Sequence, residues 1–162
     1  MIRAQRKRTI SIKDQDIETI LFRNFRGAPD RWNKDGGKRS FTVVPTEEKA
    51  AELEEAGLYV RWKDFDDGTS EPRLKVMVRF DNIPPKILMG TDPQRMLPLM
   101  EEDVGQLDNA ELVSVDLVIN PYRFEDKCTA YLQTGYFVIA PDDFRDKYSE
   151  YVEDDDLPFN VE

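Results

Sequence analysis

Alternation of apolar and polar residues, with a period of two, dominates the regular parts of this chain. The pattern is typical of half-buried β-strands, and the segments that show it are 17–25, 39–44, 58–65, 73–80, 111–122 and 129–140. Only residues 47–57 have helical character, because Thr46 can cap their first turn and Gly57 can end the helix. Since helices do not alternate with the strands, a parallel βαβ sheet is disfavoured and a small antiparallel barrel or sandwich is expected.

The clearest hairpin joins residues 58–65 to residues 73–80, and alternate side chains of each strand point to opposite faces. One face is apolar and is expected to pack on the core, together with three aromatic residues: Phe41, Trp62 and Phe80. The other face is basic and carries an aromatic ring: Tyr59, Arg61, Lys63, Arg73, Lys75 and Arg79. Residues 83–105 contain four prolines and are expected to form an irregular connection.

Composition excludes several kinds of active site. The 162 residues include no histidine and a single cysteine, Cys128. The chain therefore cannot supply a histidine-based catalytic system, a His-ligated metal, an internal disulfide or a thiolate zinc site. The acidic groups at 64–71 and 101–103 are better explained by a hairpin turn and a proline-rich connection than by Mg²⁺ binding. No enzymatic activity, metal or cofactor is expected.

No apolar run is long enough to span a membrane, and the first residues lack the apolar stretch of a signal peptide. A single cysteine also fits a reducing compartment. We therefore expect a soluble protein of the cytoplasm with no membrane partner.

The formal net charge of -10 is distributed unevenly along the chain. Residues 1–40 hold 11 basic and 5 acidic residues, residues 41–140 hold 10 and 19, and residues 141–162 hold 2 and 9. Segregation of this kind suggests regions that act separately. The predicted organisation is a basic N-terminal arm (1–16), a folded domain (17–140) and a disordered acidic C-terminal tail (141–162).

Aromatic and basic residues occur together in three places, which lie around the glycine-rich turn at 35–37, on the basic side of the hairpin, and near residue 122. An unpaired nucleic-acid strand needs cations along its phosphates and flat rings against its bases, so such mixtures indicate a groove for it. The alternative is that the rings are core residues and the charges are only solvated. Outside the hairpin, the main members are Phe25, Arg26, Arg31, Trp32, Lys34, Lys38, Arg39, Tyr122, Arg123, Phe124, Lys127 and Tyr131.

The tail ends in a specific combination, in which the acidic run 153–156 directly precedes an aliphatic-Pro-Phe unit. Proline stiffens the segment and presents Phe159 to an apolar pocket of a partner, while the carboxylates meet surrounding lysines and arginines. The alternatives are a solubility tail and a segment that docks Phe159 on the domain itself. The predicted partner-binding residues are Asp154, Asp155, Asp156, Leu157, Pro158 and Phe159.

These residues carry two resemblances. Residues 154–159 resemble the acidic tip of bacterial single-stranded DNA-binding proteins, which recruits replication, recombination and repair enzymes. In that family the phenylalanine is the last residue, whereas Asn160-Val161-Glu162 follow it here. Separately, a set of short segments is similar to bacteriophage-type single-stranded DNA-binding proteins built on an OB fold: 20–25, 32–33, 37–43 and 131–136.

The resemblance implies a mainly β protein, a five-stranded antiparallel OB-fold barrel with one inserted α-helix. It implies sequence-independent binding of single-stranded DNA, protection of that strand, and recruitment of replication or recombination proteins through the tail in the host cytoplasm. The predicted stacking residues are Trp32, Tyr59 and Tyr122, with Phe25 and Phe124 as further candidates. The predicted phosphate-binding residues are Arg26, Arg31, Lys34, Lys38, Arg39, Arg61, Lys63, Arg73, Lys75 and Arg79.

Other classes of function stay open at this point. An acidic protein-interaction module or DNA mimic would occupy a host nucleic-acid enzyme and ignore DNA, and a small virion component would bind only virion proteins. The sequence also leaves open whether the protein is a homodimer.

Overall fold

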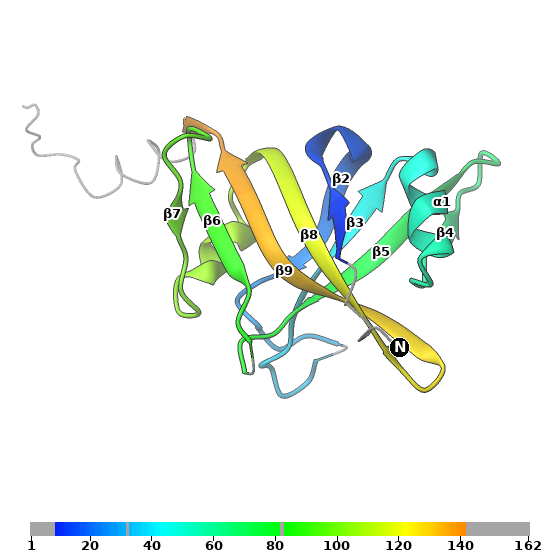
Figure 1. Ribbon diagram of the computed structural model, residues 1–162, viewed down its shortest axis with the longest axis horizontal. Coiled ribbons are helices and arrows are strands. Elements are labelled where there is room, and N and C mark those ends of the chain that lie inside the picture. The colour runs from blue at the N-terminus through cyan, green and yellow to red at the C-terminus, as the bar shows by residue number, and fades with distance from the viewer. Residues whose placement is uncertain (1–8, 32, 82, 142–162) are drawn as a thin grey trace, which may run out of the picture.

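The computed structural model describes residues 9–31, 33–81 and 83–141, which form a mainly β structure with one α-helix (Figure 1). The strands are β1 (Ile10–Ile12), β2 (Ile17–Asn24), β3 (Arg39–Pro45), β4 (Arg61–Asp64), β5 (Ser70–Val78), β6 (Lys86–Gly90), β7 (Leu97–Pro98), β8 (Leu112–Phe124) and β9 (Lys127–Ile139). The helix is α1 (Glu47–Glu55), and two 3-10 turns are η1 (Asp14–Asp16) and η2 (Val104–Asp108).

The predicted strands and the predicted helix are present. β2, β3, β8 and β9 lie where the alternation placed them, and the predicted hairpin is β4 with β5. The helix begins as expected, because the Thr46 hydroxyl oxygen accepts a hydrogen bond from the backbone N–H of Lys49 at 3.2 Å. It ends before Gly57, whose φ of 95° suits a residue without a Cβ.

One sheet contains all nine strands of the described ranges, in the order β1-β8-β9-β5-β3-β2, with β4 on β5 and β6 and β7 beside β9. Most pairs are antiparallel, but β5 and β6 both run parallel to β9. The hydrogen-bonded path is open, because β1 and β2 do not pair within the described ranges. The prediction of a five-stranded antiparallel barrel is therefore corrected to an open sheet with more strands and two parallel pairs, a pairing of distant segments that alternation does not reveal.

The two ends of this sheet path are consecutive in the chain, since β1 ends at Ile12 and β2 begins at Ile17. Asp14, in the intervening turn η1, holds this link against β8. Its backbone N–H donates to Asp116 Oδ1 at 3.0 Å, and its own Oδ1 accepts from the N–H of Val115 at 2.8 Å. The link therefore brings the start of β2 close to β8 at the far end of the path, so the sheet is strongly curled.

Three aromatic rings fill the centre of the inner face. Phe25 and Phe41 stack with centroids 5.0 Å apart, and Phe137 meets both edge-on at 5.6 and 6.4 Å. All three are fully buried, which confirms the core assignment of Phe41. The predicted inner face of β5 also packs there: Leu74, Val76 and Val78.

The assignments of the other two aromatic residues have different outcomes. Phe80 is partly buried against the core. Trp62 is 40 % exposed, so its placement in the core was wrong. β4 lies at an edge of the sheet, and the indole Nε1–H of Trp62 instead donates to Glu54 Oε2 of α1 at 3.0 Å.

The connection 83–105 is more regular than its prolines indicated. It contains β6, which follows Pro84 and Pro85 and pairs with β9, as well as β7. Residues 10–12, within the predicted arm, form β1 and pair with β8, so the sheet begins earlier than the alternation indicated.

Candidate nucleic-acid interface

Cations gather on the outer face of the β4–β5 hairpin. The antiparallel register places Arg61 opposite Arg73 and Lys63 opposite Glu71. Lys75 follows Arg73 on the same face of β5, because side chains two positions apart in a strand share a face. We call Arg61, Lys63, Arg73 and Lys75 the basic face.

The basic face is only partly neutralised. Arg73 Nε donates to Glu71 Oε2 at 3.0 Å. Within the described residues, Arg61, Lys63 and Lys75 are exposed and form no ion pair or side-chain hydrogen bond. Like charges directly opposite each other on neighbouring strands are destabilising, so the Arg61–Arg73 pair does not help the chain to fold. An external anion would relieve this repulsion.

One aromatic residue beside the basic face was missed by the sequence reasoning. Phe22 of β2 is 67 % exposed, and the Arg73 guanidinium lies over its ring with Cζ 5.6 Å from the centroid. Alternation alone could not locate it, because the register between β2 and β3 shifts between Leu21 and Asn24 and changes which side chains share a face.

A second group of rings lies on β8 and β9, beside the end of β5. Tyr131 of β9 is the register partner of Met77, and its ring meets that of Tyr122 edge-on at 6.1 Å. Arg79 Cζ lies 5.9 Å from the Tyr131 centroid. Tyr122 is therefore where the prediction placed it, at the surface, while Tyr131 adds a ring that was not chosen as a stacking residue.

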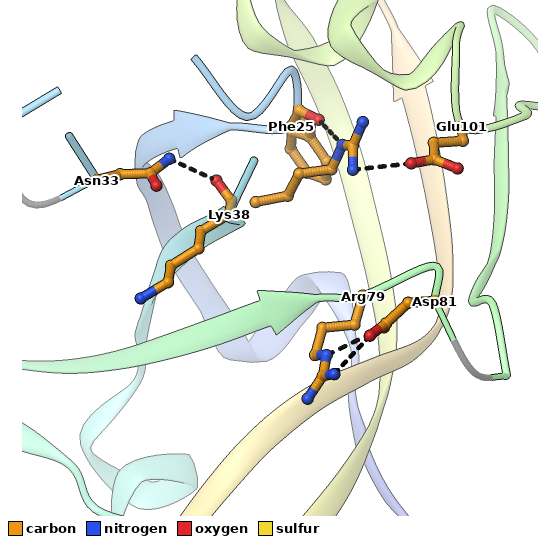
Figure 2. Close-up of polar contacts among 7 residues, drawn as sticks. Phe25, Asn33, Lys38, Arg79, Asp81 and Glu101 are labelled. Atoms are coloured by element: carbon orange, nitrogen blue, oxygen red, sulfur yellow. Dashed lines mark hydrogen bonds and ion pairs between the residues drawn. The ribbon is translucent and has the colours of Figure 1, made fainter. Parts of the chain in front are cut away.

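The charge of Arg79 is already engaged with an acidic group (Figure 2). Its Nε and Nη2 donate to the two carboxylate oxygens of Asp81 at 3.1 and 2.6 Å. These bonds raise the pKa of Arg79, with a smaller effect from Tyr131, and they hold the pKa of Asp81 below its ordinary value. A phosphate at Arg79 would have to compete with Asp81.

The β8–β9 hairpin extends beyond the rest of the sheet (Figure 1). Near its tip, Phe124 is 62 % exposed. The Arg123 side chain of this hairpin lies beside Gly57 at the end of α1, since a Cβ placed on Gly57 would lie only 2.5 Å from its Nη2 atom. A cation there also suits the negative end of a helix whose last turn has no basic residue. Tyr59, close to Gly57 in sequence, is 72 % exposed.

The loop between β2 and β3 is held by hydrogen bonds of its own. The side-chain amide of buried Asn33 donates to the carbonyl oxygens of Ala28 and Lys38 at 3.3 and 3.1 Å. At the start of the loop, Asp108 of η2 accepts from the backbone N–H groups of Phe25 and Arg26 at 2.5 and 3.1 Å. The loop therefore presents its basic residues from a fixed frame; all of them are exposed: Arg26, Arg31, Lys34 and Lys38.

Arg39 has a structural position instead. Its Nε donates to the carbonyl oxygen of Phe25 at 2.8 Å, and its Nη1 donates to Glu101 Oε2 at 3.1 Å (Figure 2). Cζ also lies 5.3 Å from the ring centroid of Phe80. With these partners and a side chain only 19 % exposed, Arg39 links the β2–β3 loop to the connection 83–105.

Of the remaining predicted site residues, one is buried and the others lie outside the described ranges. Phe25 is fully buried in the aromatic core, so its assignment as a base-stacking residue was wrong. The bulge in β2 between Leu21 and Asn24 turns its ring inward. Trp32 and the tail residues 154–159 lie outside the described residues.

The described residues contain neither a metal-binding cluster nor a membrane-spanning helix. No group of three or more Cys, Asp or Glu side chains in these ranges is arranged to hold a metal ion. None of the helices in residues 9–31, 33–81 and 83–141 combines the length and hydropathy needed to cross a bilayer.

The sequence model of a family described as "putative phage ssDNA-binding domain" matches residues 1–162, the whole chain. Searches against curated proteins and against solved structures gave no match.

Proposed function

The chain belongs to the phage ssDNA-binding domain family, and from this premise we propose that it binds single-stranded DNA, without sequence preference, along the outer side of its sheet. The observation that carries the proposed site is the basic face, where Arg61 and Arg73 lie opposite each other with Lys75 beside them. Phosphates would relieve their mutual repulsion, and the exposed rings nearby would stack on bases. The loop cations and the tip of the β8–β9 hairpin would extend the contact on both sides.

We propose further that the curled sheet is an OB-type barrel of the partly open kind. The path β2-β3-β5 continues into β9 and β8, and the last neighbour of β8 is β1, the segment just before β2. In this view β1 and β2 are two halves of one strand that bends at η1, and α1 is the inserted helix. The order of the strands and the bonds of Asp14 to β8 support the proposal.

The proposed mechanism is passive. The family is one of binding domains rather than of enzymes, and binding requires no covalent step. The protein would cover the strand, keep it free of hairpins, exclude nucleases and pass it to proteins of phage replication, recombination or repair in the host cytoplasm.

The acidic tail would provide the contact with those partners. Residues 153–162 contain five acidic residues and no basic residue, and they include the Leu-Pro-Phe unit. Such a segment fits a basic, apolar-centred pocket of another protein. The same charge would compete with phosphates for the basic face.

One experiment tests the proposal. Full-length protein and a variant lacking residues 153–162 are compared in electrophoretic shift assays with oligo-dT and with duplex DNA of the same length, over a range of salt. We expect tight binding to oligo-dT that weakens with salt, by about 0.7 in log K per decade for each phosphate contacted, and tighter binding by the truncated variant. Absence of any shift with oligo-dT at low salt, for both proteins, would contradict the proposal and favour a DNA mimic.

A further inference from the structure

Phe22 combines an unfavourable backbone conformation with an exposed ring. Its φ is 53°, in the left-handed region that a bulky residue occupies only at a cost in free energy. It lies where the register between β2 and β3 shifts, and a glycine would fit this position without strain. The ring is also 67 % exposed, so burial of the side chain does little to offset the free-energy cost of this backbone conformation.

The exposed ring has one fixed neighbour. Arg73 Cζ lies 5.6 Å from its centroid, and Arg73 is held in turn by the Glu71 carboxylate. A flat ring and a planar guanidinium are two kinds of group on which unpaired bases stack, and here the ring is exposed while the Arg73 side chain is 22 % exposed. The side chains are therefore in place before any ligand arrives.

A similar arrangement occurs just past the end of β5, against β9. Arg79 Cζ lies 5.9 Å from the centroid of Tyr131. Arg79 directly follows the last residue of β5 and is six positions beyond Arg73, about 20 Å at roughly 3.3 Å per residue. Lys75 lies between them on the same side of β5 and is exposed. Two ring-and-guanidinium pairs are thus separated by a cation, along one line.

We propose that Phe22 and Arg73 form a stacking site for one unpaired base, and that the bound strand follows β5 from there to Tyr131 and Arg79. This inference rests on the proposed function and assigns a residue and a path to it. Lys75 binds a phosphate between the two stacking sites. The span of about 20 Å corresponds to about six nucleotides at ~3.4 Å each, and to fewer if the strand is stretched.

The first test compares substitutions at residue 22 by their affinity for a long oligo-dT. Phe22→Ala should lower the affinity about 5- to 150-fold, because the loss of one stacked base has that size, and Phe22→Trp should retain it. Tyr136→Ala is the matched control, since Tyr136 is a partly exposed aromatic of β9 outside the proposed path. An unchanged affinity of Phe22→Ala, in a protein whose wild type binds oligo-dT, overturns the inference and leaves the proposed function standing.

The second test separates binding from folding. Phe22→Gly relieves the left-handed backbone, so its melting temperature should rise by about 2–4 °C while its affinity for oligo-dT falls as in Phe22→Ala. A higher melting temperature together with a lower affinity would show that the Phe22 side chain serves binding rather than folding. A fall in melting temperature would show that Phe22 serves the fold and would count against the inference.

The third test concerns the path along β5. An oligo-dT of about three nucleotides reaches only one stacking site, so Phe22→Ala and Tyr131→Ala should each lower its affinity about 2-fold, and the double variant should abolish binding. A long oligo-dT contacts both stacking sites at once, so each single variant should lower its affinity by the whole contribution of one stacked base. Equal losses for the short and the long oligonucleotide would contradict a path that joins both sites.

Discussion

Arg39 and Arg61 are both arginines at the first position of a strand, yet the protein surrounds them differently. Arg39 is the register partner of Val78 and shares the inner face with Phe41, so its guanidinium lies against the core. There it meets a carbonyl oxygen, the Glu101 carboxylate and the ring of Phe80. Burial of a charge requires such partners, because a cation removed from water without them is costly.

Arg61 lies on the outer face, where water satisfies its charge and the described part of the chain supplies no counter-ion. Its nearest partner across the strands is another arginine. The comparison shows that the face of a strand, rather than the residue type, decides whether a cation stabilises the fold or remains available to an anion. The two regions should therefore respond in opposite ways to substitution.

The largest effect is expected on the basic face. The triple variant Arg61→Gln, Lys63→Gln, Lys75→Gln should lose about 100-fold in affinity for oligo-dT at ~0.1 M salt, with a salt slope shallower by about 2, because three phosphate contacts are removed. Thermal stability should not fall, since the triple variant also removes the Arg61–Arg73 repulsion. Salt titrations followed by fluorescence anisotropy measure both quantities.

A matched control removes the same charge elsewhere. Lys13→Gln, Lys86→Gln, Arg95→Gln alters three exposed cations away from the β4–β5 hairpin. If this control lost as much affinity as the first triple variant, net charge rather than the basic face would determine binding, and the comparison would fail.

Arg39 should show the reverse behaviour. Arg39→Ala should lower the free energy of unfolding by about 1–3 kcal/mol, because the carbonyl oxygen of Phe25 and the Glu101 carboxylate lose a charged donor. Arg39→Lys should not restore stability, since one ammonium cannot replace a guanidinium that bonds two separate acceptors. Urea denaturation measures the loss. A stable Arg39→Ala protein with a shallower salt slope would place Arg39 among the phosphate contacts instead.

Alternation within the sequence was enough to find β2, β3, β5, β8 and β9, because each strand buries one side on a common core. It also held the answer for Arg39, which is in phase with Phe41 and Val43 and therefore on the inner face. β6 was missed because it is defined by its parallel pairing with β9, a contact between distant segments that leaves no local pattern.

The errors at single aromatic residues have a physical cause as well. A period of two gives the face of a side chain but not what covers that face. Trp62 is on the inner side of its strand, opposite Pro72, yet it remains 40 % exposed because β4 is at the edge of the sheet. Phe22 and Phe25 depend on a bulge, which shifts the phase of a strand by one residue.

Arg79 is intermediate between the two regions, since it is exposed but already paired with Asp81. Asp81→Asn should raise the affinity for oligo-dT up to about 5-fold at ~0.1 M salt, because it releases one cation for a phosphate contact. The double variant Asp81→Asn, Arg79→Gln should lose this gain, which separates release of Arg79 from the general effect of one fewer negative charge. An equal gain in affinity for the single and the double variant would show that Arg79 plays no part in binding oligo-dT.

The smallest expected effect is a change in the pKa of Asp81, which reports directly on its pairing with Arg79. Hydrogen bonds from Arg79 hold the pKa of Asp81 below its ordinary value of 3.8, so Arg79→Gln should raise it toward that value. Because the folded-state pKa is the lower one, the pair contributes to stability above pH ~3.8 and loses that contribution as the pH falls through the folded-state value. NMR titration of the carboxyl groups measures the change, and Asp67 is an internal control, since hydrogen bonds from Thr69 lower its pKa and do not depend on Arg79. If the pKa of Asp81 were the same in Arg79→Gln as in the wild type, the ion pair would not be maintained in solution. Arg79 would then be as available to phosphate as Arg61.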